Sequence, residues 1–476
     1  MSKQSNTRTI LPLFEALVSV YVLMGMLAFN IFVKDGEWLG AYSNQYILLI
    51  AALVAVLIGF KNKISLAKVV QEILANIRSV SVPILILFLV GALSGTWLIS
   101  GVIPAMVYYG LQVLNPTVFL PASVIIAAII SVATGSSWTT SATVGIALVG
   151  IGTALGIPSG MIAGAVISGA YFGDKMSPLS DTTNLAPAMA GTDLFTHIKY
   201  MAMTTVPSLI LTLIAFVIIS VSIETTGNAD LSSLLEVIGN TFYISPWLFT
   251  VPGVVVLLIL LKVKPLISLL SGVVLAAVFA LFLQPDLLKN IALSPLSAIQ
   301  TSIFTDIQIH TDNEALNELF SSGGMKGMIW TILLIISAMV FGGAMDAIGA
   351  LSKITEVLLK MATSVFGLFA STVLSCLGLN IIASDQYLAI VIPGKMFKDA
   401  YAEKGLAPQN LSRTLEDSGT VTSVLIPWNT CGAYQSSVLG VSVADYFVFA
   451  IFNYVSPITT LIFAAFNIKI KQLLEK

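Results

Sequence analysis

The sequence predicts an all-α polytopic membrane protein with about 10 to 12 transmembrane helices. Hydrophobic residues make up 57% of its 476 residues and charged residues only 10%, whereas roughly a quarter of the residues in a soluble domain are charged. The mean hydropathy is +0.96. The apolar runs have about the length of a membrane-spanning helix, 17 to 25 residues. They lack the alternating segments of a membrane barrel, so the spans are expected to be helices.

The apolar runs follow one another along the whole chain. In order, the predicted spans are residues 11–33, 44–60, 80–100, 118–134, 138–156, 158–173, 200–222, 245–261, 265–283, 329–349, 364–382 and 445–468. We divide the chain into N-terminal helices at 1–79, a first repeat half at 80–222, connecting helices with an acidic external loop at 223–328, and a second repeat half at 329–476.

The distribution of Lys and Arg predicts the orientation of the spans. Lys3 and Arg8 precede the first span, Lys61 follows the second, and the C-terminal segment around Lys469 is also basic. The loop at 223–244 contains acidic residues and no Lys or Arg. Because cytoplasmic loops are enriched in Lys and Arg, both termini are expected to be cytoplasmic. The net charge of -2 gives no reason to expect a nucleic-acid partner.

Four polar interruptions divide the predicted spans, two in each half. They are the segments 134–143, 173–187, 380–386 and 416–432. Paired interruptions of this kind are typical of membrane proteins built from inverted-topology repeats, whose discontinuous helices meet near the bilayer midplane. We therefore predict two inverted repeats with discontinuous helices or re-entrant hairpins at the midplane.

The interruption at 173–187 contains the charges of Asp174, Lys175 and Asp181 together with Pro178. A charged side chain at the bilayer centre costs at least about 2.5 kcal/mol, so such residues are candidates for function. Pro178 also disfavours an intact helix between the two aspartates.

The interruptions are rich in oxygen ligands. Freed carbonyls, hydroxyls and carboxylates together suit a small hard cation such as sodium. The predicted ion-binding and proton-coupling residues are Asp181, Asp174, Asp385, Thr182, Asn184, Ser136, Thr139 and Asn429. Sodium itself is placed at Asp181, Asp174, Thr182 and Ser136. A carboxylate at such a site can hold either a proton or sodium, and this competition is the simplest form of coupled antiport.

Structural roles remain open as alternatives for several of these charges. Asp174 and Lys175 could form an ordinary interfacial pair, and Asp181 could cap the helix that follows it. Asp417 beside Glu416 could likewise cap the fourth segment.

Two histidine positions allow alternatives of the same kind. Asp193 and His197 are four residues apart, which suits either a proton relay or an interfacial pair. His310 lies beside Asp312 and Glu314 in the acidic loop, where a solvated histidine is the alternative to a metal site.

Two runs carry a family resemblance. Ala-Thr-Gly-Ser-Ser-Trp-Thr-Thr at 133–140 and Gly-Ala-Tyr-Phe-Gly-Asp-Lys-Met-Ser-Pro-Leu-Ser-Asp-Thr-Thr-Asn-Leu-Ala at 169–186 resemble the signature of the NhaC family of sodium/proton antiporters. The segments 384–387 and 426–432 are similar to that family as well. The resemblance covers nearly the whole chain apart from the loop at 284–328. It implies a prokaryotic inner-membrane carrier of the ion-transporter superfamily.

The resemblance leaves the substrate open between two classes. The first is Na+/H+ antiport, which serves sodium extrusion and pH homeostasis. The alternative is a Na+- or H+-coupled organic anion exchanger such as a malate/lactate antiporter, for which Lys175 or Lys395 would supply a buried cation. The expected partners are Na+, H+ and the lipid bilayer, with a small organic anion and a homodimer as alternatives. No cofactor is expected, and the chain carries no nucleotide-binding loop or metal triad that would indicate an enzyme.

Overall fold

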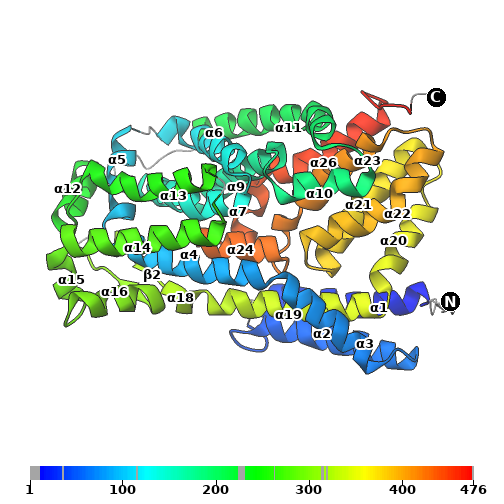
Figure 1. Ribbon diagram of the computed structural model, residues 1–476, viewed down its shortest axis with the longest axis horizontal. Helices are drawn as coiled ribbons and strands as arrows, with labels where there is room; N and C mark the ends of the chain where they lie inside the picture. Colours follow the sequence, from blue (N-terminus) through cyan, green and yellow to red (C-terminus); the bar gives the residue numbers. More distant parts are fainter. Residues whose placement is uncertain are drawn as a thin grey trace.

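The computed structural model describes residues 11–34, 37–113, 116–222, 231–261, 263–311, 316–317 and 320–473. Lys3, Arg8, Asp312 and Glu314 lie outside these ranges, so the predictions that use them stay predictions. The molecule is an elongated helical bundle in which α1, α20 and α22 lie toward one end and α12, α15 and α16 toward the other (Figure 1).

The first four helices form one edge of the bundle. They are α1 (Leu13–Lys34), α2 (Ser43–Lys61), α3 (Leu66–Ser79) and α4 (Ser81–Ile99). α1 packs on α2, while α2 and α3 both pack along α19 (Ile329–Ala347) from much later in the chain. Ser65 caps α3, because its side chain accepts a hydrogen bond from the Lys68 amide at 3.3 Å.

The next segment of the chain contains the first two interruptions. Its elements are α5 (Val102–Val113), α6 (Pro116–Thr134), α7 (Ser137–Thr140), the π-helical turn η1 (Ser141–Gly145), α8 (Ile146–Ala154), α9 (Ser159–Met176), α10 (Asp181–Ala190) and α11 (Leu194–Ser222). α6 and α9 approach closely through glycines. A Cβ at Gly169 would lie 2.2 Å from the Val124 carbonyl oxygen, and one at Gly173 would lie 2.4 Å from Ser131 Cβ. Small residues at such a contact let two helix backbones come together.

The connecting segment contains shorter helices and the strand pair. Its elements are α12 (Leu231–Thr241), η2 (Pro246–Phe249), α13 (Thr250–Leu260), α14 (Pro265–Leu283), α15 (Pro285–Ile291), α16 (Pro295–Phe304), β1 (Ile307–Gln308), β2 (Ser321–Ser322) and α18 (Gly324–Gly327). β1 and β2 pair antiparallel with Ile307 opposite Ser322. α14, α15 and α16 each begin at a proline, which suits the first helical position because no amide hydrogen is needed there.

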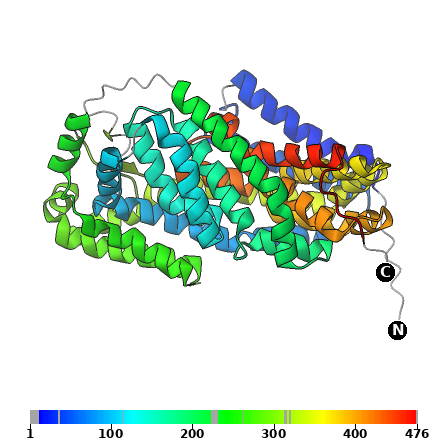
Figure 2. The same cartoon turned by 90° about the horizontal axis from the view of Figure 1, so that it is seen from above.

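The last segment contains the other two interruptions. After α19 come α20 (Ala350–Lys360), α21 (Val365–Ile382), α22 (Gln386–Glu403), α23 (Pro408–Leu415), the π-helical turn η3 (Glu416–Thr420), η4 (Ser423–Leu425), α24 (Thr430–Leu439), α25 (Val443–Tyr446), η5 (Phe447–Phe449) and α26 (Ile451–Ala465). α26 contacts α9, α11 and α21, and Figure 2 shows the red C-terminal helix crossing the teal-green α11. Helices from the early and late parts of the chain therefore pack against one another.

The prediction of an all-α polytopic membrane fold is confirmed. Among the described residues, eight helices are long and apolar enough to cross a membrane, and up to ten if each of two bent helix pairs is one span. The upper count of ten spans equals the lower end of the predicted range of 10 to 12. The predicted span at 138–156 is divided into α7, η1 and α8, and the one at 445–468 is bent by 50° before α26.

The outer surface suits a lipid environment. On α11, the side chains of Ile210, Leu211, Ile214 and Ile218 are all at least half exposed. Apolar side chains exposed along a whole helix face indicate contact with lipid rather than water.

Candidate functional site

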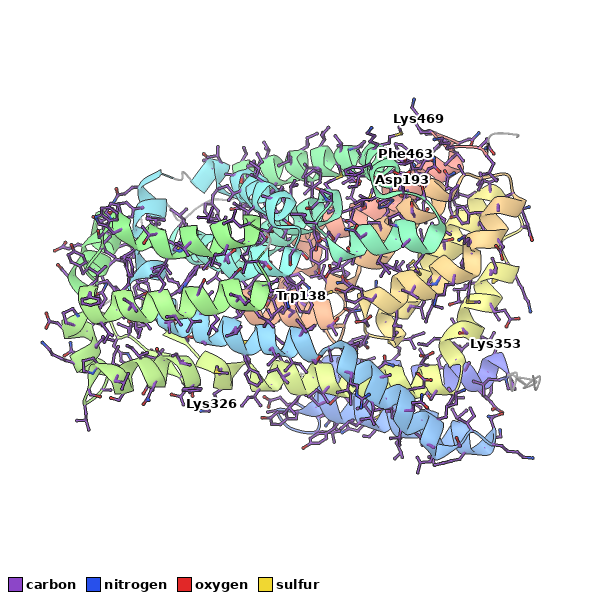
Figure 3. All side chains as sticks on the ribbon, in the orientation of Figure 1. Trp138, Asp193, Lys326, Lys353, Phe463 and Lys469 are labelled. Atoms are coloured by element: carbon purple, nitrogen blue, oxygen red, sulfur yellow. The ribbon has the colours of Figure 1, made fainter. Side chains whose placement is uncertain are left out.

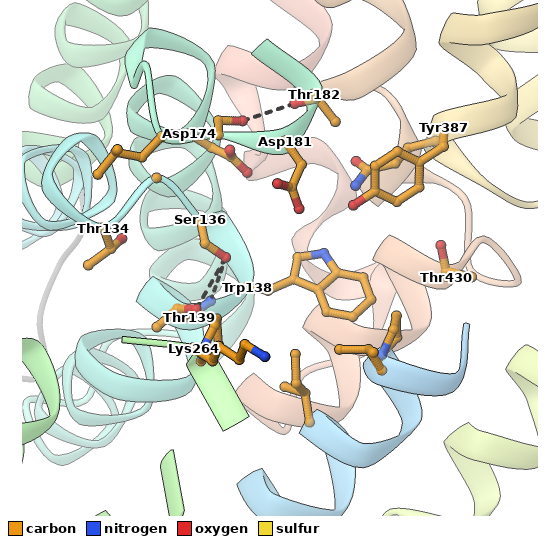
Figure 4. Close-up of a pocket in the computed structure, with 18 of the residues that line it drawn as sticks. Thr134, Ser136, Trp138, Thr139, Asp174, Asp181, Thr182, Lys264, Tyr387 and Thr430 are labelled. Carbon is orange, nitrogen blue, oxygen red and sulfur yellow. Dashed lines mark hydrogen bonds between the residues drawn. The ribbon is translucent and has the colours of Figure 1, made fainter. Parts of the chain in front are cut away.

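A cavity of about 630 Å³ lies where the interrupted helices meet (Figure 4). Three carboxylates line it, those of Asp174, Asp181 and Asp385, and Lys264 is the only Lys or Arg among its described lining residues. The aliphatic hydroxyls in its wall belong to Ser79, Thr134, Ser136, Thr139, Ser180, Thr182 and Thr430. The cavity is therefore acidic and rich in oxygen ligands.

The first wall of the cavity forms where α6 ends. Gly135 has φ +72°, a left-handed conformation that costs glycine little because it lacks a Cβ. Ser136 then caps α7, since its Oγ accepts a hydrogen bond from the Thr139 amide at 3.2 Å. Thr139 Oγ1 also donates to Ser136 Oγ at 3.2 Å. The predicted interruption at 134–143 is thus narrower in the structure, because the chain is helical again from Ser137.

Asp174 lies in the last turn of α9 and is held by the start of α7. The amide and the hydroxyl of Ser137 both donate hydrogen bonds to Asp174 Oδ2, at 3.0 and 2.7 Å. These two bonds join the two interruptions of the first half. Because both hydrogen bonds are donated to the carboxylate, they favour its ionised form.

Asp181 does not cap α10, so that alternative is wrong. Ser180 is the cap, and its Oγ accepts from the Thr183 amide at 3.4 Å. Asp181 is instead the first helical residue, and its exposed side chain lies in the cavity with Asp174 and Ser136 (Figure 4). The positive end of the α10 dipole favours a negative charge at this position.

Asp385 repeats the local geometry of the first wall. Its Oδ1 accepts a hydrogen bond from the Leu388 amide at 3.0 Å and caps α22. Ser384 immediately before it has φ +59°. A left-handed residue followed by a capping side chain is the same arrangement as Gly135 and Ser136.

Asn429 holds the last two interruptions together rather than lining the cavity. Its Oδ1 accepts from the Cys431 amide at 3.0 Å and caps α24, while its Nδ2 donates to the Asn380 carbonyl at 3.0 Å. The Thr430 amide donates to the Ser384 carbonyl, also at 3.0 Å. The cavity-lining residue here is Thr430.

Asn184 also lies outside the cavity lining. Its Nδ2 donates to the carbonyls of Pro178 and Ser180, at 2.9 and 2.7 Å, and so closes the loop between α9 and α10. The structure therefore brings together the predicted residues Asp181, Asp174, Asp385, Thr182, Ser136 and Thr139, and gives Asn184 and Asn429 local structural contacts.

A buried ion pair lies behind the cavity. Lys175 is fully buried and donates to Asp417 Oδ1 of η3 and, at 2.8 Å, to Ser456 Oγ of α26. Asp417 Oδ2 accepts from Thr204 Oγ1 of α11 at 2.8 Å and from Thr460 Oγ1 of α26. Four elements are thus linked through one carboxylate.

This ion pair contradicts two of the structural alternatives. Lys175 does not form an interfacial pair with Asp174, because its ammonium group is buried against Asp417. Glu416 and Asp417 do not cap a segment, because the backbone remains helical through the π-helical turn to Thr420. A lysine in an apolar run signals that a carboxylate lies on a neighbouring element, but the sequence does not show which one.

An aromatic stack closes another side of the cavity and was not predicted. The rings of Trp138 and Tyr434 are 3.9 Å apart at an angle of 17°, and the Tyr434 hydroxyl donates to the Trp138 carbonyl at 3.1 Å. Trp138 lies near the middle of the molecule (Figure 3). The stack joins α7 to α24 and hence the first interruption to the last.

Asp193 and His197 form neither the proton relay nor the interfacial pair that their spacing allows. Asp193 Oδ1 accepts from the Thr196 amide at 2.9 Å, whereas His197 Nδ1 is hydrogen-bonded to Ser412 Oγ at 2.9 Å. His310 is exposed. Within the described part of the chain, no group of three His, Cys, Asp or Glu side chains could hold a metal ion.

Interrupted helices that meet at an acidic, oxygen-rich cavity define a secondary transporter. The chain belongs to the Na+/H+ antiporter family, whose sequence model matches residues 169–468. It is 39% identical over 386 residues to the Na+/H+ antiporter NhaC of Alkalihalophilus pseudofirmus, covering 81% of this chain and 82% of that protein. It is 37% identical over 394 residues to NhaC of Bacillus subtilis, covering 82% and 85%.

The name of a further relative is that of an organic anion antiporter. The malate-2H+/Na+-lactate antiporter of Bacillus subtilis is 35% identical over 449 residues, covering 93% of this chain and 92% of that protein. The family resemblance of the sequence motifs is therefore confirmed, and the relatives differ in the solutes that their names give.

Proposed function

We propose that this protein exchanges Na+ for H+ across the cytoplasmic membrane. The observation that carries the proposal is the charge of the cavity, in which the three carboxylates of Asp174, Asp181 and Asp385 outnumber the amine of Lys264, the only Lys or Arg among the described lining residues. An excess of carboxylates among neutral hydroxyl oxygens attracts a small hard cation and repels an anion. Membership of the Na+/H+ antiporter family supports the same function.

In this proposal, sodium binds between the two interruptions of the first half. Asp174 and Asp181 supply the charge, and Ser136 and Thr182 supply neutral oxygens from α7 and α10. When sodium leaves, empty carboxylates in a closed cavity would be costly. Protons therefore replace sodium on the return step, and this competition couples the two ion flows.

Local parallels between the halves support an inverted-repeat mechanism. α10 and α24 each contain ten residues. Each follows a capping side chain, Ser180 or Asn429, and each ends at a left-handed glycine, Gly191 or Gly440. We infer that the two predicted repeat halves alternate about the cavity, so that it opens to one side of the membrane at a time.

The positions of lysines support cytoplasmic termini. Figure 3 places Lys353 and Lys469 toward the end of the molecule at which α1 begins and Lys326 toward the opposite end. An excess of basic residues on one side is expected on the cytoplasmic side.

Everted membrane vesicles test the proposed exchange. Respiration acidifies the vesicle interior, and added sodium chloride is expected to dissipate this pH gradient, whereas choline chloride is not. Vesicles from cells that lack the protein provide the background. Dissipation that requires malate or lactate in addition to sodium would contradict simple Na+/H+ antiport.

The volume of the cavity favours one second candidate, the organic anion exchanger. A volume of about 630 Å³ is typical of a small-molecule pocket and holds roughly twenty waters at about 30 Å³ each. The charges oppose this candidate, because Lys175 is already neutralised by Asp417 and Lys395 is exposed. An organic anion would enter only after cations had neutralised the carboxylates, so its uptake should depend steeply on sodium or protons.

A further inference from the structure

Glu416 is a fully buried carboxyl group that the proposed sodium site does not use. It is the first residue of the π-helical turn η3, and its side chain has no exposed surface. Its Oε1 accepts a hydrogen bond from Thr182 Oγ1 at 3.0 Å. Its Oε2 has no hydrogen-bond partner among the described residues. A buried, charged carboxylate oxygen without a donor is unfavourable, whereas the carbonyl oxygen of a neutral, protonated carboxyl group costs much less to leave without a partner.

The charges around Glu416 do not neutralise it directly. Lys175 and Asp174 interact with it electrostatically from α9, but the Lys175 ammonium group already binds Asp417 and Ser456. The buried thiol of Cys376 faces it from α21.

Arg413, one helical turn before Glu416, lies over the Tyr200 ring at 4.6 Å. Its guanidinium nitrogens have no hydrogen-bond partner within the described chain. The Thr420 hydroxyl, in the same turn, also interacts with Glu416. No group makes a hydrogen bond to Oε2 within the described chain, so the neutral, protonated carboxyl group is the form that fits there.

Thr182 connects this carboxyl group to the cavity. Thr182 lines the cavity, and the same hydroxyl contacts Glu416 Oε1 and lies 3.2 Å from Ser180 Oγ. We propose that Glu416 is a proton-binding site of the exchanger and that the Thr182 hydroxyl couples it to sodium in the cavity. This proposal rests on the proposed Na+/H+ exchange and adds a second group that carries protons.

The coupling follows from the direction of one hydrogen bond. When Glu416 is ionised, Thr182 donates its hydrogen to Oε1 and keeps its lone pairs for sodium. When Glu416 is protonated at Oε1, this O–H donates to Thr182 Oγ1 and occupies one of its lone pairs. The Thr182 hydrogen must then turn toward Ser180 or the cavity, where it opposes a cation. Sodium binding therefore expels the Glu416 proton into cavity water, although sodium itself does not bind to Glu416.

Proton release on sodium binding tests the proposal. Purified full-length protein in detergent is mixed with sodium chloride in weakly buffered solution, and the released protons and the sodium Kd are measured at several pH values. The Glu416→Gln variant should release about one proton fewer per bound sodium. The change of its sodium Kd per pH unit should therefore be about tenfold smaller than in wild type. Glu356→Gln, which alters a partly exposed carboxylate of α20 that pairs with Lys353 and Lys360, should behave as wild type.

Two outcomes separate the failure of this proposal from that of the exchange itself. If wild type releases no protons when sodium binds, Na+/H+ exchange at this cavity is wrong. If wild type releases protons and Glu416→Gln releases as many with the same pH dependence, Glu416 is not a proton site. If Glu416→Gln does not fold, sodium-induced infrared difference spectra of wild type decide the matter. These spectra should show the loss of a carboxylic-acid C=O band. The absence of this loss would overturn the proposal.

Thr182 variants test the connection. Thr182→Ser keeps the hydroxyl and should retain the wild-type proton release, whereas Thr182→Val should lose the share that Glu416 contributes, about one proton per bound sodium. In the double variant with Glu416→Gln, Thr182→Val should cause no further loss of proton release, because both changes remove the same coupling. Additive losses would show that the two groups act independently.

Discussion

Lys175 of α9 and Asp417 of η3, 242 positions apart in the sequence, form an ion pair in which neither side chain has any exposed surface. The pair connects the second interruption to the last. Because Asp417 also accepts hydrogen bonds from the hydroxyls of Thr204, Ser456 and Thr460, its charge is compensated by four donors.

Removing one member of this pair should destabilise the protein strongly. Lys175→Met leaves Asp417 buried without its counter-charge, and the loss of a partner in a buried pair costs about 3 to 5 kcal/mol. Thermal unfolding of the purified protein in detergent measures the effect. Lys326→Met, which breaks the exposed pair with Asp306, should cost at most about 1 kcal/mol. Similar losses in the two variants would contradict the importance of burial.

Asp181→Asn should abolish exchange while leaving the fold intact. Asp181 lines the cavity and forms no structural cap, so the change removes a charge for sodium without removing a support for α10. The rate of sodium-induced dissipation of the pH gradient in everted vesicles measures activity, and membrane abundance measures folding. Asp286→Asn, at an exposed position of α15, should leave the rate unchanged. Full activity of Asp181→Asn would place sodium elsewhere.

The positions of the interruptions could be predicted from the sequence, because charges and clustered hydroxyls are costly within apolar runs unless a protein-lined cavity receives them. The cavity carboxylates Asp174, Asp181 and Asp385 were found in this way. The sequence also suggested Asn184 and Asn429, which the structure places outside the cavity lining. A side-chain amide that makes local backbone contacts and one that binds an ion look alike in a sequence.

The long-range partners could not be predicted. The pairing of Lys175 with Asp417 and the stacking of Trp138 on Tyr434 depend on which faces of distant helices meet. Membrane helices are apolar on most sides, so hydrophobic periodicity does not identify these faces. The surroundings of Glu416 were hidden for the same reason, since its contact with Thr182 joins residues 234 positions apart.

Ser137→Ala should weaken sodium binding without lowering the maximum rate. The Ser137 hydroxyl donates one of two hydrogen bonds to Asp174 Oδ2, and a hydrogen bond to a charged group contributes about 1.5 to 3 kcal/mol. The half-saturating sodium concentration should therefore rise roughly tenfold. Losing a donor favours protonated Asp174, so protons compete better and the increase should be largest at acidic pH.

The sodium dependence of exchange at several pH values checks this prediction. Ser222→Ala, at the exposed end of α11, is the matched control. An unchanged half-saturating concentration in Ser137→Ala at acidic pH would show that Asp174 does not bind the transported cation.

The two left-handed residues before the cavity caps should respond in opposite directions to substitution. Ser384→Gly should stabilise the protein by about 1 kcal/mol, because it removes a strained backbone conformation (φ +59°) and a buried hydroxyl without a partner among the described residues. Gly135→Ala should destabilise the protein, since the added Cβ would lie 2.6 Å from Leu179 Cβ and the alanine would adopt a strained backbone conformation.

Gly349→Ala is the matched control, because it introduces the same backbone strain, at φ +72°, with no atom within 4 Å of the added Cβ. Its loss of stability should be smaller than that of Gly135→Ala by the cost of overpacking, about 1 to 3 kcal/mol. Melting temperatures in detergent rank the three variants, and equal losses at Gly135 and Gly349 would show that Leu179 can move aside.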